Sequence, residues 1–107
     1  MNISKLIRSL GIRSTLKGYR YLKYGLELCM RDEDYLLAVY KELYPDIAEY
    51  FGTTQDGVEH CIRTAVCSCW YKGNRSLLYK IAGYELLQKP TNSEFIDILY
   101  HYLNTQE

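Results

Sequence analysis

Residues 47–70 read IAEYFGTTQDGVEHCIRTAVCSCW, a helical apolar pattern that stops at FGTT and restarts within four residues. Two helices joined by a turn of three or four residues are typical of a helix-turn-helix. Ala48 supplies the small residue that such helices need where they cross, and Gly52 can adopt the positive φ that the turn requires. Thr54 is placed to cap the second helix. The stretch therefore predicts a helix-turn-helix whose second helix spans about 54–70.

The two faces of this second helix differ in character. Val58 and Ile62 are its expected aliphatic anchors on the apolar face. The polar face carries Gln55, Asp56, Gly57, Glu59, His60, Arg63 and Thr64. Gln and Arg pair with base edges in the major groove of DNA, and Glu accepts a hydrogen bond from cytosine. We interpret the polar face as a candidate DNA-reading surface, with Glu59, His60 and Arg63 in the groove.

The acidic groups on this face oppose binding to a polyanion. Asp56 and Glu59 are compensated with certainty only by Arg63, so phosphate affinity must come mainly from flanking cations. The flanking candidates are Lys17, Arg20, Lys23, Lys72, Arg75 and Lys80. His60 would be favoured in its protonated form beside a phosphate, and the alternative is an exposed neutral side chain without a role.

The rest of the chain also has helical apolar spacing and no alternating strand pattern of useful length. We therefore predict an all-α, compact bundle of about six helices. The expected helices span about 3–10, 15–30, 32–51 with a kink or a fresh start at Pro45, 54–70, 76–82 and 92–103. Expected boundary residues are Gly11 after the first helix, Ser14 or Thr15 before the second, the acidic residues 32–34 before the third, and Thr91 or Asn92 before the last.

Length and composition limit the class of protein. At 107 residues, with 48% hydrophobic and 24% charged residues, the chain is expected to form a single domain over 1–107. The sequence has no apolar run of about 18 residues and no recognisable signal peptide. We therefore expect no association with a membrane and a location in the cytoplasm. Its 12 tyrosines are expected at the core and its rim rather than in a base-stacking surface.

The cysteines and the motifs do not indicate an enzyme or a cofactor. Cys29, Cys61, Cys67 and Cys69 lack the paired spacing of a zinc site, and Cys67 and Cys69 should face opposite sides of one helix. Nucleophile motifs and glycine-rich phosphate loops are also missing from the sequence. We expect no metal, no cofactor and no catalytic activity.

The net charge of zero conceals alternating blocks of charge. The blocks carry +6 over residues 1–31, −7 over 32–60, +4 over 61–91 and −3 over 92–107. Blocks of this kind can create local fields, so the neutral total does not exclude an anionic partner. The alternative is that they are ordinary solvated faces.

Several segments closely resemble the C-terminal effector domain of stage zero sporulation protein A, the response regulator that controls entry into sporulation in endospore-forming bacteria. They are LGIRSTLKGYRYL (10–22), LYPDIAEYFGTT (43–54), the pattern V-E-x-x-I-R (58–63), W-x-x-G-N (70–74), KIAGY (80–84) and KPTNSEFI (89–96). The resemblance implies a six-helix domain whose recognition helix enters the major groove of a TGTCGAA-like element. It also implies head-to-tail dimers on tandem elements and contact with the primary sigma subunit of RNA polymerase.

The recognition helix departs from the family pattern. That pattern has Arg at the positions of Gly57 and His60 and His at that of Thr64, whereas Glu59 and Arg63 are retained. Each bidentate arginine contact provides roughly 1–3 kcal/mol of discrimination. An altered DNA element or a lower affinity is therefore expected.

Two further expectations follow from the resemblance. The 107 residues begin almost at the effector fold, without the receiver domain of the family. If they are the full natural chain, we expect no switch by aspartyl phosphorylation within it; if they are part of a longer chain, the switch lies outside them. A protein-interaction module of the same fold, binding the sigma subunit or a full-length relative, is the alternative to DNA reading. The acidic block over 32–60 and the altered helix favour this alternative, and the operator and the sign of regulation stay open.

Overall fold

Six α-helices, one 3-10 helix and one π-helix make up most of a computed structural model that describes residues 2–105. The α-helices are α1 (Ile3–Ser9), α2 (Lys17–Arg31), α3 (Tyr44–Phe51), α4 (Gln55–Lys72), α5 (Arg75–Ala82) and α6 (Asn92–Asn104). The 3-10 helix η1 spans Glu33–Leu37, and the π-helix η2 spans Val39–Leu43. No strand occurs among the described residues, and the predicted all-α class is confirmed.

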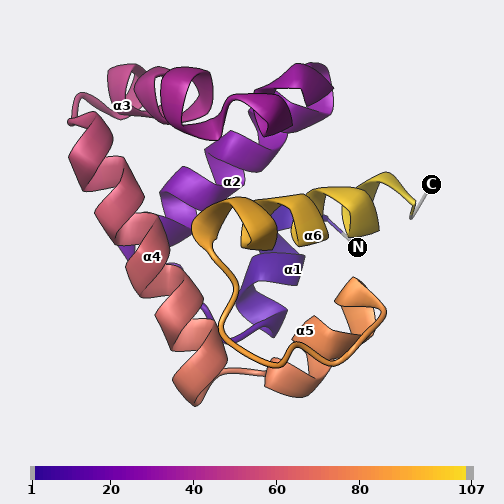
Figure 1. The fold of residues 1–107 in the computed structure, drawn as a ribbon. Coiled ribbons are helices and arrows are strands. Elements are labelled where there is room, and N and C mark those ends of the chain that lie inside the picture. The colour runs from indigo at the N-terminus through magenta and orange to yellow at the C-terminus, as the bar shows by residue number, and fades with distance from the viewer. Residues whose placement is uncertain (1, 106–107) are drawn as a thin grey trace.

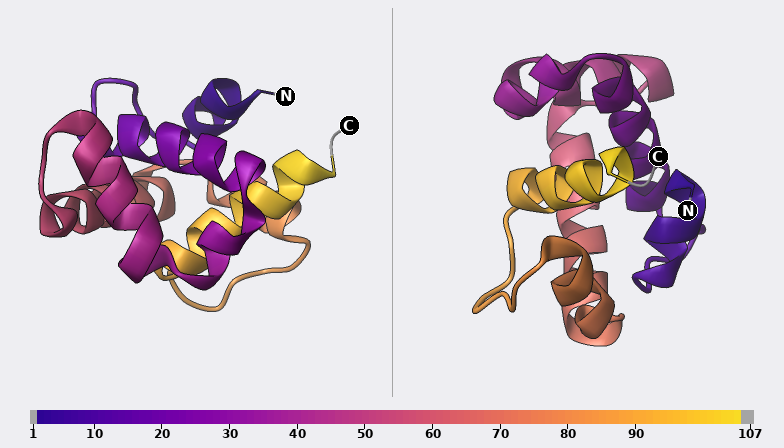
Figure 2. Two further views of the ribbon diagram at one scale, coloured as in Figure 1. Left: turned by 90° about the horizontal axis from the view of Figure 1, so that it is seen from above. Right: turned by 90° about the vertical axis from the view of Figure 1, so that its right-hand side faces the viewer.

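The α4 helix runs along one edge of the molecule. The α3 helix lies across the upper end of α4, α6 crosses in front of the core and α2 lies behind (Figure 1). The start of α1 and the end of α6 lie on the side away from α4 (Figure 1, Figure 2). Side chains from all these helices form one apolar core, in which Leu6, Leu26 and Phe95 are completely buried. One face of α4 therefore packs on the core while the opposite face is left at the surface.

The connection between α1 and α2 follows the prediction in part. Gly11 has a φ of 90°, as expected after the first helix. The prediction that Ser14 or Thr15 caps the second helix is wrong, because the N-cap is Leu16, which makes no side-chain cap bond. The N–H of Leu16 instead closes a turn to the carbonyl oxygen of Arg13 at 3.1 Å. Both hydroxyl residues lie inside this turn, so α2 begins after it.

The predicted continuous third helix is wrong over residues 33–43. The Asp32 side chain accepts a hydrogen bond from the N–H of Asp34, but the helix that follows is the 3-10 helix η1, and it ends at Ala38 with φ −144° and ψ 50°. The π-helix η2 then buries Val39 and Leu43. Burial of these two side chains decides the local backbone, because short 3-10 and π turns provide little stability of their own. The α3 helix follows η2 directly, with Leu43 and Tyr44 both in the right-handed helical region. Pro45 lies in the first turn of α3, where a missing N–H costs no α-helical hydrogen bond.

The turn between α3 and α4 has the predicted features. Ala48 is 6% exposed, and Gly52 ends α3 in the left-handed region with φ 67° and ψ 39°. The hydroxyl of Thr54 accepts a hydrogen bond from the N–H of Gly57 at 3.0 Å and so caps α4. The helix-turn-helix geometry is therefore set by a left-handed glycine and a capped second helix.

The last two helices are bounded mainly as expected. Gly73 ends α4, and Gly83 ends α5 with a φ of 89°. Thr91 is the N-cap of α6 and forms a capping box with Glu94. None of the helices within residues 2–105 is long and apolar enough to span a membrane.

Candidate nucleic-acid interface

The α4 helix presents a polar face to solvent because its apolar anchors hold the opposite face on the core. Val58 and Ile62 are completely buried, as predicted, while Cys61 is only half-buried. Of the predicted readers, Asp56, His60, Arg63 and Thr64 are exposed, and Gln55 and Glu59 are half-buried. The structure therefore brings these side chains together on one accessible side of a single helix.

Glu59 and Arg63 form a bidentate ion pair along this face. The Arg63 guanidinium donates from Nε to Glu59 Oε2 at 3.0 Å and from Nη2 to Glu59 Oε1 at 2.5 Å. The Arg63 side chain is 52% exposed and that of Glu59 33%. An exposed i, i+4 pair contributes only about 0.3–0.5 kcal/mol to stability. Its main physical effect is to hold the guanidinium in one orientation at the surface.

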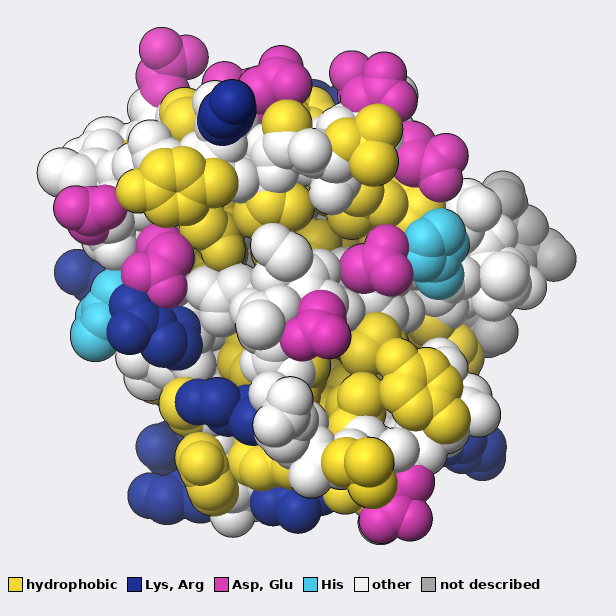
Figure 3. Space-filling model, viewed as in Figure 1, with side chains coloured by type: hydrophobic (Ala, Val, Ile, Leu, Met, Phe, Trp, Pro, Cys, Tyr) yellow, Lys and Arg dark blue, Asp and Glu magenta, His cyan; other side chains and the backbone are white. Residues whose placement is uncertain are grey.

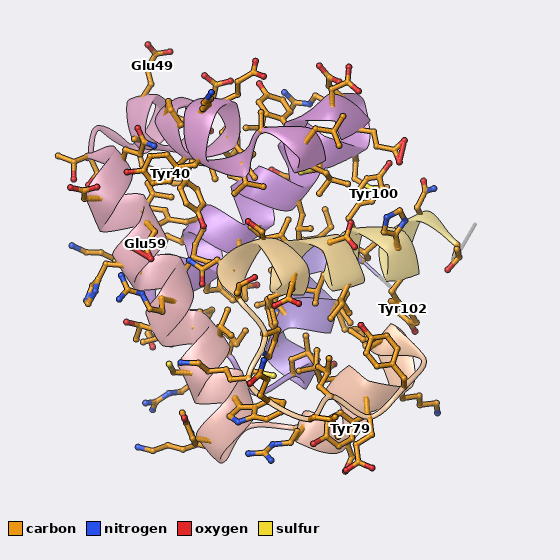
Figure 4. The ribbon with its side chains drawn as sticks, viewed as in Figure 1. Tyr40, Glu49, Glu59, Tyr79, Tyr100 and Tyr102 are labelled. Carbon is orange, nitrogen blue, oxygen red and sulfur yellow. The ribbon has the colours of Figure 1, made fainter. Side chains whose placement is uncertain are left out.

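Two amide side chains join α4 to its neighbours. Gln55 donates from Nε2 to the carbonyl oxygen of Tyr40 in η2. Asn92, the first residue of α6, donates from Nδ2 to the carbonyl oxygen of Glu59 at 3.0 Å and to the hydroxyl of Tyr44 at 3.1 Å. Figure 4 labels Tyr40 and Glu59, which lie one above the other at the front of the α3–α4 corner. These bonds fix the orientation of the first half of α4.

Asn92 and Tyr44 support this face, and neither could be identified in this role from the sequence. Asn92 lies 33 residues after Glu59, so no local spacing reveals the bond. Burial raises the pKa of the Tyr44 phenol, and the hydrogen bond from Asn92 opposes that change. The neutral hydroxyl therefore remains available as an acceptor.

The predicted flanking cations differ in how they are held. Lys72 is exposed at the end of α4, and Lys80 is exposed on α5. Arg75 is instead directed at Trp70, with its guanidinium 3.9 Å from the ring centroid and with Nε and Nη2 both donating to the Trp70 carbonyl oxygen. Arg75 is therefore held against Trp70, whereas Lys72 and Lys80 are exposed to solvent.

The predicted cations of α2 lie at the surface, and Arg20 and Lys23 border a hollow with Tyr50 and Phe51 of α3. Lys17, Arg20 and Lys23 are exposed, and Gly18 next to them packs directly on the backbone of Cys61. Figure 3 shows Lys and Arg along the lower left edge, where α4 runs, and Asp and Glu along the top, over η1, η2 and α3. The charge blocks of the sequence therefore become separate regions of the surface.

A family model described as sporulation initiation factor Spo0A C terminal matches residues 3–103. The chain belongs to this family. The match runs from the start of α1 to within one residue of the end of α6 and so includes the whole helix-turn-helix. Family members are DNA-binding effector domains of the sporulation response regulator, and the resemblance drawn from the sequence segments is confirmed. This family regulates transcription and is not a family of enzymes.

The positions at which we expect departures from the family pattern are 57, 60 and 64, on the side of α4 that faces away from Val58 and Ile62. Gly57 is half-buried, and His60 is exposed and shares a turn with Thr64, whose hydroxyl donates to the His60 carbonyl oxygen at 3.1 Å. With arginine absent from positions 57 and 60, Arg63 is the arginine in the first half of the helix. The positive charge of the recognition helix is correspondingly low at its start.

A further cation, which the sequence analysis did not single out, reaches α4 from another segment. Lys89 donates from Nζ to Cys67 Sγ at 3.1 Å and lies 5.9 Å from the centroid of the Tyr71 ring. The hydrogen bond to Cys67 is the main cause that raises the pKa of the Lys89 ammonium. Cys67 is half-buried while Cys69 is buried, so the two cysteines face different sides of α4 as predicted. Within residues 2–105, no three His, Cys, Asp or Glu side chains gather as metal ligands would.

Proposed function

We propose that this Spo0A C-terminal domain is a sequence-specific transcription regulator that places α4 in the major groove of double-stranded DNA. The observation that supports this proposal is the Glu59–Arg63 pair at the surface of α4. This helix is tied to η2 through the Gln55 side chain and to α6 through the Glu59 carbonyl oxygen. A reader that is already oriented loses less conformational freedom when it binds a base edge. Residues 1–107 would act as one folded unit in the cytoplasm, where the chromosome lies.

The proposal assigns roles along α4. Arg63 would donate to guanine, Glu59 would accept from cytosine, and His60 and Thr64 would contact the same groove further out. Gln55 and Asp56 lie near the helix start, and Lys72, Arg75 and Lys80 are the proposed phosphate contacts. The departures from the family pattern lead us to expect an element that differs from the family's TGTCGAA-like sequence. Dimers on tandem elements and contact with the sigma subunit belong to the same proposal.

Selection of bound duplexes from a random pool, at low and at physiological salt, tests DNA reading. We expect one short sequence to be enriched. In Arg63→Ala the preference at one or two base positions should weaken by roughly 5- to 150-fold, which corresponds to the loss of one bidentate contact. Arg31→Ala is the matched control, because Arg31 is exposed at the far end of α2. An unchanged motif in Arg63→Ala would show that the reader lies elsewhere.

Protein interaction is a second candidate function. It is favoured by an acidic face over η1, η2 and α3, which carries the Asp and Glu side chains of residues 32–49 (Figure 3). Leu37 and Tyr40 are 86% and 61% exposed within this face. Tyr40 also lines a hollow of about 470 Å³ together with Val39, Tyr44 and Val66, and the same hollow is bordered by Glu59, Arg63 and Lys89 of the proposed DNA-binding surface. An apolar protein contact would persist as salt rises, whereas DNA affinity falls steeply. A clear DNA footprint with no retention of the sigma subunit in a pull-down would eliminate this second function.

A further inference from the structure

The two halves of the recognition helix carry opposite charge. Asp56 and Glu59 outnumber Arg63 in the first half of α4. Residues 65–75 contain Lys72 and Arg75 but no acid. Contacts with a polyanion are therefore favoured at the second half of α4 rather than at its start.

The segment that joins α5 to α6 lies beside the second half of α4. It leaves α5 at Gly83, runs back across the front of α5, and rises beside the lower part of α4 to enter α6 at Thr91 (Figure 1, Figure 2). The hydrogen bond of Asn92 to the Glu59 carbonyl oxygen anchors its end on α4. Lys89 stands three residues before this anchor, so its backbone is held close to the helix.

Lys89 meets α4 on the stripe that also carries the proposed reader. Arg63, Cys67 and Tyr71 follow one another at intervals of four residues and so share one side of the helix. The Lys89 ammonium contacts Cys67 Sγ at 3.1 Å and lies 5.9 Å from the ring centroid of Tyr71, which is 68% exposed. No carboxylate forms a salt bridge with Lys89 within the part of the chain that the structure describes. A thiol is a weak acceptor, so the ammonium retains donors for an anion.

We propose that Lys89 and the hydroxyl of Tyr71 together bind a backbone phosphate of the DNA duplex, at the rim of the groove in which α4 lies. This inference rests on the proposed DNA-reading function. Arg63 and Tyr71 are eight residues apart, about 12 Å along the helix axis, which is close to the width of the major groove. A reader at Arg63 on the groove floor therefore leaves Tyr71 and Lys89 near the bordering phosphates.

Salt titrations of affinity for the selected duplex test this site, with Lys89→Gln, Lys89→Arg and Tyr71→Phe compared with the unmodified chain. Lys89→Gln should reduce the slope of log K against log salt by about 0.9, the value for one lost phosphate contact. Lys89→Arg should retain the slope because it keeps the charge. Tyr71→Phe should weaken binding two- to tenfold with an unchanged slope, because it removes a donor but no charge. Lys5→Gln is the matched control, because Lys5 is exposed on α1, which packs against α2.

Circular dichroism melts of each variant establish that the fold is retained, as expected for side chains at the surface. If the unmodified chain selects a sequence but Lys89→Gln keeps its full salt slope, the phosphate site is wrong while DNA reading stands. If the unmodified chain selects no sequence at any salt, DNA reading and the phosphate site both fail.

Discussion

Gly52 is the residue on which the bend between α3 and α4 depends. Its φ of 67° lies in the left-handed region, and a β-carbon added there would meet no atom within 4 Å. A substitution at this position is therefore opposed by backbone strain and not by a clash. Arg63 depends on the same bend, because the bend sets the direction in which the outward side of α4 faces.

We predict that Gly52→Ala lowers the free energy of unfolding by about 1–2 kcal/mol, the cost of a left-handed alanine. Gly52→Asn should cost less, because asparagine tolerates this conformation. Urea unfolding measures both changes. Gly83→Ala is the control, since Gly83 has a φ of 89° and equally free surroundings at the end of α5. Gly83→Ala should lower the free energy of unfolding by a similar amount and leave DNA affinity unchanged. If Gly52→Ala left the free energy of unfolding unchanged, the strain argument would be wrong.

The crossing of α2 and α4 is the close helix–helix contact that supports the recognition helix from behind. A β-carbon at Gly18 would lie 2.2 Å from the carbonyl oxygen of Cys61 and 2.9 Å from Cβ of Ala65. Backbone atoms cannot move away as a flexible side chain can. The absence of a side chain at position 18 therefore lets α2 approach the backbone of α4 directly.

We predict that Gly18→Ala destabilises the protein by about 1–3 kcal/mol or more through overpacking, although alanine is the better helix former. Gly57→Ala, in the first turn of α4, should cost less, because its β-carbon would approach only the hydroxyls of Thr53 and Thr54 at 3.1 Å. Denaturant unfolding of the two variants compares them directly. Equal stabilities would show that α2 and α4 can separate without cost.

The whole molecule depends on one core in which two thiols are completely buried. Burial is the main cause that raises the pKa of Cys29 to about 11 and that of Cys69 to about 11, from an ordinary value of 9.0. In the unfolded chain these thiols ionise at the ordinary value, while the folded protein keeps them protonated. The contribution of the two thiols to the free energy of unfolding is therefore fully present below pH 9 and is lost as pH rises from 9 to 11.

We predict that the free energy of unfolding falls between pH 9 and pH 11, and that Cys29→Ala/Cys69→Ala shows a shallower decline. A hydrogen bond to Asp46 also raises the pKa of Tyr35, to about 12, so Tyr35 contributes to the decline at high pH as well. Comparing the double variant with the unmodified chain separates the contribution of the thiols from that of Tyr35. Guanidinium unfolding at pH 8, 9.5 and 10.5 provides the measurement. Cys61→Ala keeps both buried thiols and should follow the unmodified chain; the same slope in all three proteins would exclude a thiol contribution.

Much of the fold could be predicted from the sequence because it depends on interactions between residues that are close along the chain. A left-handed glycine at position 52, a hydroxyl cap at Thr54 and apolar residues at helical spacing from Val58 onward act within a few residues of one another. The all-α class, the helix-turn-helix and the outward side of α4 could therefore be predicted. The segments that resemble the Spo0A C-terminal family also lie in the sequence itself, and the family match over residues 3–103 confirmed them.

Contacts between distant residues were decided by the tertiary structure alone. The bonds of Asn92 to Glu59 and of Lys89 to Cys67 join residues 33 and 22 positions apart, and no periodicity encodes such pairs. The 3-10 and π-helices over residues 33–43 likewise arise because burying Val39 and Leu43 outweighs the weak preference of a short segment for a regular α-helix. The all-α class and the hydroxyl caps at Thr54 and Thr91 follow from neighbours along the chain. The helix type over residues 33–43 and the support and charge around Arg63 follow from which helices the common core brings together.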